Sequence, residues 1–155
     1  MQTLNNDNRF DIDLEFGQET EKYFKDLFYD NKNRVEVKTE HTIWQKTKNL
    51  FIEIFDKSRN KPTGIRVTES EWWLQAFRDN ESKEHIFSLL VPTPILKDIL
   101  SKWEAKPNFV KDCLKENVGD RGGVTDGYAI PVERLVKELL NYKIKKGESN
   151  DQNKL

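Results

Sequence analysis

The stretch RVEVKTE at residues 34–40 alternates apolar and polar side chains without a break. Because successive side chains of a β-strand point to opposite faces, this alternation predicts a strand with its two valines on one face and Glu36 and Lys38 on the other. NLFIEIF at residues 49–55 predicts a second strand, in which a single acid, Glu53, lies between apolar neighbours. An acid in a strand that is buried on both faces usually has a specific role, since an unpaired charge is costly to bury.

Hydrophobic spacing and turn residues predict the rest of the chain. FDIDLEF at 10–16 alternates and predicts a short strand or an extended arm, which Gly17 ends. Thr68 and Glu71 have the spacing of a helix capping box and predict a helical turn, followed by a strand that runs to about Phe77. The other predicted elements are a helix over 18–29, a strand over 85–91, a helix over 94–103 capped by Thr93, a helical turn within 109–117, and a short strand and helix over 128–142. This order predicts an α+β fold with a mostly antiparallel sheet.

A chain of 155 residues is the usual length of one domain. We expect a flexible N-terminus over 1–9, one domain over 10–141 and a disordered polar tail over 142–155. No window approaches the roughly 18 apolar residues that a membrane span requires, and the N-terminus lacks the basic and apolar segments of a signal peptide. The single cysteine, Cys113, cannot form an internal disulfide, so a reducing cytoplasm is the expected location.

Charge is distributed unevenly along the chain, although the formal net charge is only −1. Residues 1–29 carry seven acidic and three basic side chains, whereas residues 30–61 carry five acidic and eight basic ones. The basic connections between the predicted strands could bind the phosphates of a polyanion, and the candidates are Lys46, Lys48, Arg59 and Lys61. Ordinary loop solubility explains the same lysines equally well.

An antiparallel hairpin of the two strands, with residue numbers that sum to 89, would place Glu36 opposite Glu53. Directly paired carboxylates repel one another unless something between them compensates, and Lys38 would lie on the same face. A divalent cation is a natural compensation, because hard oxygen ligands suit Mg²⁺ or Mn²⁺. The alternative is that Glu36, Lys38 and Glu53 are simply the solvated face of a hairpin.

A set of short motifs resembles the PD-(D/E)XK nucleases, most of all the small stand-alone members in bacteriophage genomes. The motifs are GQETE at 17–21, VEVKTE at 35–40, NLFIEI at 49–54, KPTGI at 61–65 and TESEWW at 68–73. The resemblance covers about residues 15–95 and implies a metal-dependent phosphodiesterase fold, with a mixed central sheet flanked by helices.

Residue by residue, the resemblance implies a catalytic role for four side chains. Glu19 matches the helix carboxylate that supports a metal or orients water, and Glu36 and Glu53 match the paired metal-binding acids. Lys38 matches the lysine that stabilises the attacking hydroxide or the pentavalent phosphate. The implied enzyme is a Mg²⁺- or Mn²⁺-dependent DNA endonuclease, which would act in the host cytoplasm if a phage encodes it.

The order of the motif departs from the family pattern, in which acid-x-Lys follows on the second strand. Here the lysine is on the first strand, and Phe55 stands two residues after Glu53. Either the lysine has migrated, or Glu36-x-Lys38 is the main motif with Asp30 or Glu53 as its partner acid, or the chain is an inactive member.

Three functions therefore remain open. The first is the endonuclease, with DNA as partner and a homodimer as one arrangement, since many nucleases that cut both strands act as dimers. The second is a non-catalytic nucleic-acid or protein binding module on the same fold. The third is an interaction protein that uses the acidic N-terminal third to mimic or block a host factor.

Overall fold

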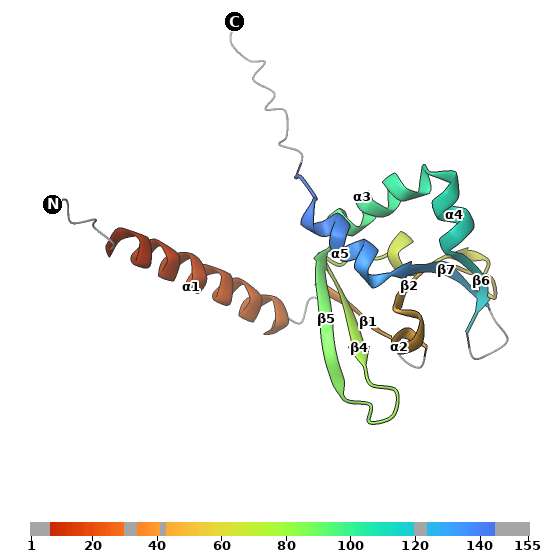
Figure 1. Cartoon of the computed structure of the whole chain (residues 1–155), viewed down its shortest axis with the longest axis horizontal. Coiled ribbons are helices and arrows are strands. Elements are labelled where there is room, and N and C mark those ends of the chain that lie inside the picture. The colour runs from red at the N-terminus through yellow and green to blue at the C-terminus, as the bar shows by residue number, and fades with distance from the viewer. Residues whose placement is uncertain (1–6, 30–33, 41–42, 120–123, 145–155) are drawn as a thin grey trace, which may run out of the picture.

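The computed structural model describes residues 7–29, 34–40, 43–119 and 124–144, and for residues 7–16 it describes the backbone alone. Figure 1 shows the arrangement of the elements. The helices are α1 (Asp7–Tyr29), α2 (Trp44–Thr47), α3 (Thr93–Glu104), α4 (Pro107–Cys113) and α5 (Val132–Leu140), with a 3₁₀ turn η1 (Gly64–Arg66). The strands are β1 (Val35–Glu40), β2 (Asn49–Asp56), β3 (Lys61–Pro62), β4 (Trp72–Arg78), β5 (His85–Pro92), β6 (Leu114–Val118) and β7 (Thr125–Pro131).

The described strands form two hydrogen-bonded sheets. One has the order β1-β4-β5, with β1 parallel to β4 and β4 antiparallel to β5. The other has the order β3-β2-β7-β6 and is antiparallel throughout. The predicted α+β class with mixed, mostly antiparallel strand pairing is confirmed, and the strands are divided between two sheets.

The predicted hairpin of the first two strands is wrong. Strand β1 pairs with β4, so that Glu36 is the partner of Trp73, whereas β2 pairs with β7, so that Glu53 is the partner of Gly127. A hairpin needs a short connection that reverses the chain, and the chain between β1 and β2 instead contains helix α2. The mostly apolar β2 has neighbours on both edges, which suits a strand that is half-buried or buried along its length.

The predicted strand over residues 10–16 is also wrong, because α1 is helical from Asp7 to Tyr29. Alternation over seven residues is too short to distinguish the two-residue period of a strand from the 3.6-residue period of a helix. Gly17 lies inside the helix and does not end it. A glycine costs about 0.5–1 kcal/mol in a helix, and a 23-residue helix tolerates one. The helix also begins within the segment that was expected to be flexible.

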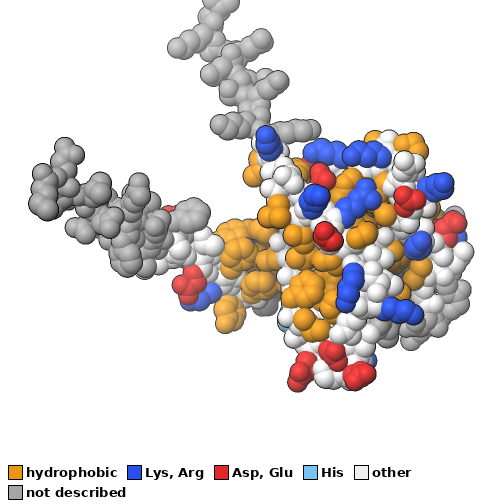
Figure 2. Space-filling view, in the orientation of Figure 1, with side chains coloured by type: hydrophobic (Ala, Val, Ile, Leu, Met, Phe, Trp, Pro, Cys, Tyr) orange, Lys and Arg blue, Asp and Glu red, His pale blue; other side chains and the backbone are white. Residues whose placement is uncertain are grey.

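The C-terminal end of α1 packs against β4. Leu27 is buried, Trp72 Nε1 donates to Tyr23 Oη at 2.8 Å, and the Phe24 and Trp72 ring centroids are 5.7 Å apart. Figure 2 shows hydrophobic side chains gathered at this end of the helix and on the adjoining surface.

Two predicted caps form differently. The side chain of Thr68 does not cap a helix: its Oγ1 accepts the backbone N–H of Ser70 at 3.3 Å, and residues 68–71 are not helical. The helical turn in this region is η1, which comes before Thr68. Thr93 begins α3 instead of capping it, and its buried hydroxyl has no hydrogen-bond partner among the described residues. The helical turn expected within 109–117 is the end of α4, after which the chain turns into β6.

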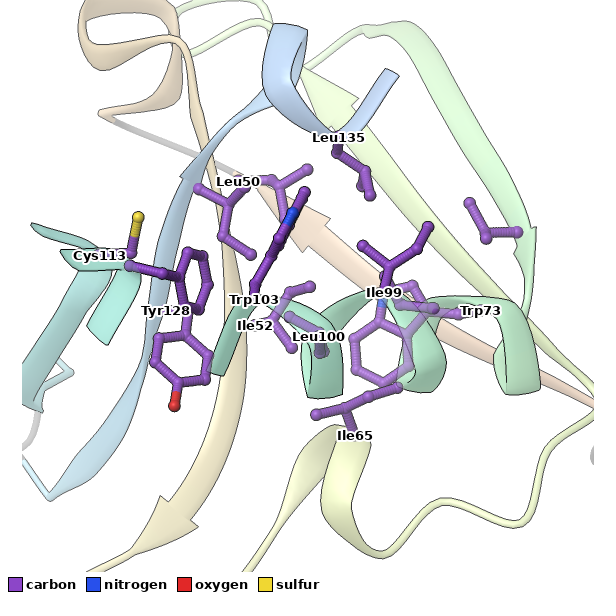
Figure 3. Close-up of a cluster of buried hydrophobic side chains, with 14 of the residues drawn as sticks. Leu50, Ile52, Ile65, Trp73, Ile99, Leu100, Trp103, Cys113, Tyr128 and Leu135 are labelled. Carbon is purple, nitrogen blue, oxygen red and sulfur yellow. The ribbon is translucent and has the colours of Figure 1, made fainter. Parts of the chain in front are cut away.

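Both sheets and the four helices α2, α3, α4 and α5 share one hydrophobic core, part of which is shown in Figure 3. Its largest buried side chains lie on β2, β4, β7, α3 and α4, and they include Leu50, Ile52, Trp73, Phe77, Ile99, Leu100, Phe109 and Ile130. Burial of a side chain of this size contributes about 1.5–3 kcal/mol, so this core stabilises the packing of β4 and β5 of one sheet against β2 and β7 of the other. No helix in the described part of the chain has the length and apolar character needed to cross a membrane.

Candidate functional site

One face of β1 carries three ionisable side chains, Glu36, Lys38 and Glu40, because the polar residues of VEVKTE alternate with apolar ones. Their partners across the β1–β4 ladder are Trp73, Gln75 and Phe77, all of which are buried. The polar face of β1 is therefore the face that looks toward the interior, between the two sheets.

Lys38 joins two of the predicted acids. Its Nζ atom lies 3.0 Å from Glu36 Oε1 and 4.0 Å from Glu53 Oε2. The side chains of Glu36, Lys38 and Glu53 are 33%, 28% and 38% exposed, so the group is reachable from solvent. The structure thus brings together three of the four predicted catalytic residues, through side chains of separate sheets and not through the predicted strand pairing.

Strand β2 is irregular next to Glu53. The β2–β7 register shifts between Glu53 and Phe55, so that Ile54 lies in a bulge. A bulge changes the direction in which neighbouring side chains point, and bulges are common next to active sites. The KPTGI connection returns to the same place, where Thr63 N donates to Ile54 O at 3.1 Å.

Trp73 forms the floor beneath Lys38. Its indole ring is 2% exposed, and Lys38 Nζ lies 5.7 Å from the ring centroid, within reach of a cation–π interaction. Trp73 is a core residue and not a platform for stacking bases. Trp72 points to the other face of β4 and is half-buried under the end of α1.

Glu40 is a member of the site that sequence reasoning missed. Its Oε1 atom accepts the backbone N–H of Phe51 at 2.5 Å and Nε2 of Gln75 at 2.7 Å. Burial raises the pKa of the Glu40 carboxyl, and the two hydrogen bonds oppose that shift. A third polar position two residues after Lys38 was visible in the alternation, but its partners on β2 and β4 were not.

Glu19 is not part of this cluster. It is exposed on α1, one turn before the Tyr23 contact with β4, and the described residues give it no contact with Lys38. Asp30, the alternative partner acid, lies outside the described residues.

The four predicted phosphate contacts lie on two connections. Lys46 and Lys48 are exposed at the end of α2, with Lys48 Nζ 5.9 Å from the centroid of a Trp44 ring. Lys61 is exposed on β3. Arg59 donates from Nε to Asp56 Oδ2 at 2.6 Å, so its guanidinium is already paired with an acid.

The group of Glu36, Lys38 and Glu53, called here the Lys38 cluster, provides only part of the ligand set that a hard cation requires. Two glutamate carboxylates are the ligands that Mg²⁺ prefers, and Mg²⁺ often completes its shell with waters and substrate phosphates. Within the described residues, however, no three His, Cys, Asp or Glu side chains form a group able to hold a metal. Glu36 and Glu53 could therefore provide two carboxylate ligands to a cation, and further ligands would have to come from outside the described side chains.

Comparison of the chain with protein-family models, with curated proteins and with solved structures gives no match.

Proposed function

We propose that this chain is a metal-dependent phosphodiesterase, specifically a DNA endonuclease of the PD-(D/E)XK type. The observation that carries the proposal is the position of Lys38, whose ammonium lies against the carboxylates of Glu36 and Glu53 at a site open to solvent. Two carboxylates that could hold a cation beside a lysine are one arrangement that supports phosphodiester hydrolysis.

Glu36 and Glu53 would hold Mg²⁺ or Mn²⁺ in this proposal. When bound, the ion would neutralise a non-bridging phosphate oxygen and lower the pKa of an attacking water. Lys38 supplies a compact positive charge beside the phosphate as negative charge develops in the transition state. Its two carboxylate neighbours keep the ammonium in place before the substrate arrives.

Binding of the flanking DNA would fall to the exposed lysines on the two connections, Lys46, Lys48 and Lys61. Such contacts bind phosphates without reading bases, so they would give affinity and a salt dependence but no sequence preference. Arg59 contributes less in this proposal, because Asp56 already neutralises its charge. A cytoplasmic location and a homodimer that cuts both strands belong to the same proposal.

A non-catalytic binding module on this fold is the second candidate. It is favoured by the fact that the Lys38 ammonium already lies between the two acids and compensates part of their negative charge. A site of that kind could hold a phosphate through Lys38 without activating water.

Cleavage by the native protein separates the two candidates. Supercoiled plasmid, single-stranded DNA and a branched duplex would each be incubated with the protein in Mg²⁺ or Mn²⁺, and binding would be measured in parallel in Ca²⁺. The nuclease proposal expects nicked or linear product that disappears in Lys38→Ala and persists in Lys115→Ala, a change to an exposed lysine on β6. Binding to all three substrates without any product would overturn it and favour the binding module.

A further inference from the structure

The geometry points to Glu40 as the positioning residue of this site: it holds β1 against the open edge of β2, so that Lys38 meets Glu53. The inference rests on the proposed function, because it assigns a role within the same site. It concerns a residue that neither coordinates the cation nor contacts the phosphate.

The first step is that the backbone does not join β1 to β2. Among the described residues, β1 pairs with β4, β2 pairs with β3 and β7, and no backbone hydrogen bond links β1 to β2. The distance between Lys38 and Glu53 must therefore be fixed by side chains.

The second step is that β2 has a donor to satisfy on the edge that faces away from β7. In the part of the chain that the structure describes, strand β3 covers that edge only at Phe55 and Asp56, and no other strand pairs with it at Phe51. The Glu40 carboxylate accepts this N–H at 2.5 Å and takes the place of the missing strand. Loss of this acceptor would leave a partly buried backbone donor unpaired, which makes the contact a strong constraint on the spacing.

The third step is that Glu40 is itself fixed from the other side. Gln75 Nε2 donates to the same Glu40 oxygen at 2.7 Å, and Trp73 Nε1 donates to Gln75 Oε1 at 2.8 Å. Gln75 and Trp73 are 3% and 2% exposed, so this chain of hydrogen bonds lies in the interior. Lys38 stands above it, paired in register with Gln75 and resting over the Trp73 ring. The network therefore connects β4, β1 and β2 directly under the lysine.

The two hydrogen bonds end on one atom, Glu40 Oε1, and this allows a decisive pair of substitutions. Glu40→Gln removes the charge but keeps a side chain of the same length with an oxygen that can accept both donors. Glu40→Asp keeps the charge but shortens the side chain by one methylene, so the oxygen no longer reaches Phe51 and Gln75. Positioning requires the oxygen in place, whereas metal binding or proton transfer requires the charge.

The experiment measures cleavage in Mg²⁺ and, independently of activity, hydrogen exchange of the Phe51 amide and the NMR shifts of the Lys38 side chain. Positioning predicts that Glu40→Gln cleaves within a few-fold of native with unchanged Phe51 exchange and Lys38 shifts. It predicts that Glu40→Asp loses about 100-fold in rate, since a misplacement near 1 Å costs about that much, with faster Phe51 exchange and moved Lys38 shifts. Thr39→Ala, an exposed position on the opposite face of β1, is the control and should match native.

The opposite result, with cleavage by Glu40→Asp and none by Glu40→Gln, would overturn the positioning role and show that the charge of Glu40 takes part in metal binding or proton transfer. Unchanged Phe51 exchange and Lys38 shifts in Glu40→Asp would overturn it as well. If the native protein cleaves nothing, the nuclease proposal fails. The exchange and shift measurements then still decide whether Glu40 sets the position of Lys38.

Discussion

Gly64 lies directly against Glu53. A Cβ atom placed on Gly64 would fall 2.5 Å from the backbone O and 2.8 Å from the Cβ of Glu53, and the glycine has a φ of +55°. Both the contact and the backbone conformation require a residue without a side chain. The glycine of KPTGI therefore allows the loop to close over β2 at the residue that carries a carboxylate of the candidate site.

Gly64→Ala should disturb the site more than it disturbs the fold. The new methyl group must displace the loop or Glu53, and either movement changes the contact between Glu53 and Lys38. We expect cleavage to fall at least tenfold beyond what the loss of stability explains. Gly119→Ala is the matched control, because Gly119 also has a positive φ, of +128°, but a Cβ atom there would meet no described residue within 4 Å apart from its chain neighbours. Equal losses of activity in the two variants, at equal melting temperatures, would show that strain alone is responsible.

Metal binding should depend on Glu53 and be weak in the absence of DNA. Two carboxylates provide only part of a Mg²⁺ shell, so affinity should increase when a phosphate adds its oxygens. Titration calorimetry with Mn²⁺ should show a site in the native protein that Glu53→Gln loses and Glu133→Gln, an exposed change on α5, retains. Equal binding in all three proteins would remove Glu53 from the metal site.

The alternation of VEVKTE was sufficient to predict β1 and the shared face of Glu36 and Lys38. It was not sufficient to predict the strand beside it, because a period of two residues marks which side chains share a face and carries no information about which face is turned inward or about the partner strand. The true partner, β4, begins at Trp72, and parallel pairing with it depends on contacts that are remote in sequence. Glu36 and Glu53 were expected to be close because of a hairpin that does not exist, and the shared core brings them to Lys38 by another route.

Glu40 and Gln75 show what local sequence cannot indicate. A buried glutamine in the strand WWLQAFR has no pattern that distinguishes it from a solvated one, and its role depends on meeting Glu40 across the ladder. The segment FDIDLEF shows the opposite error, since a short alternation was interpreted as a strand where the chain forms a long helix. Periodicity needs length before it separates a helix from a strand.

Acid should reduce stability through Asp56. Hydrogen bonds from Ser58 and Arg59 lower the pKa of Asp56 from 3.8 to about 2. A carboxyl whose pKa is lowered in the folded state adds stability above its unfolded value, and that stability is lost as the pH falls from about 4 to about 2. Asp56→Asn should therefore lower the melting temperature at pH 7, and its difference from native should shrink toward pH 2. Asp112→Asn, an exposed change on α4, should show no such convergence. A constant difference across the pH range would indicate that Asp56 contributes through packing and not through its charge.

Lys38→Ala should separate an enzyme from a binder. If the ammonium acts in the transition state, its removal slows cleavage by about 10²-fold or more, while DNA affinity changes little, because one phosphate contact among several is lost. If Lys38 only anchors a phosphate, DNA affinity and its salt dependence decrease together, and the cleavage rate of bound DNA is unchanged.

The measurements are a nicking time course at saturating protein in Mg²⁺ and binding in Ca²⁺ at several salt concentrations. Lys115→Ala on β6 is the control for the loss of one positive charge. Because Lys38 compensates part of the negative charge of Glu36 and Glu53, its loss leaves two half-exposed acids without that counter-charge, and Mn²⁺ affinity should increase in Lys38→Ala if these acids are the metal ligands. Unchanged Mn²⁺ affinity together with an unchanged cleavage rate would remove Lys38 from the site.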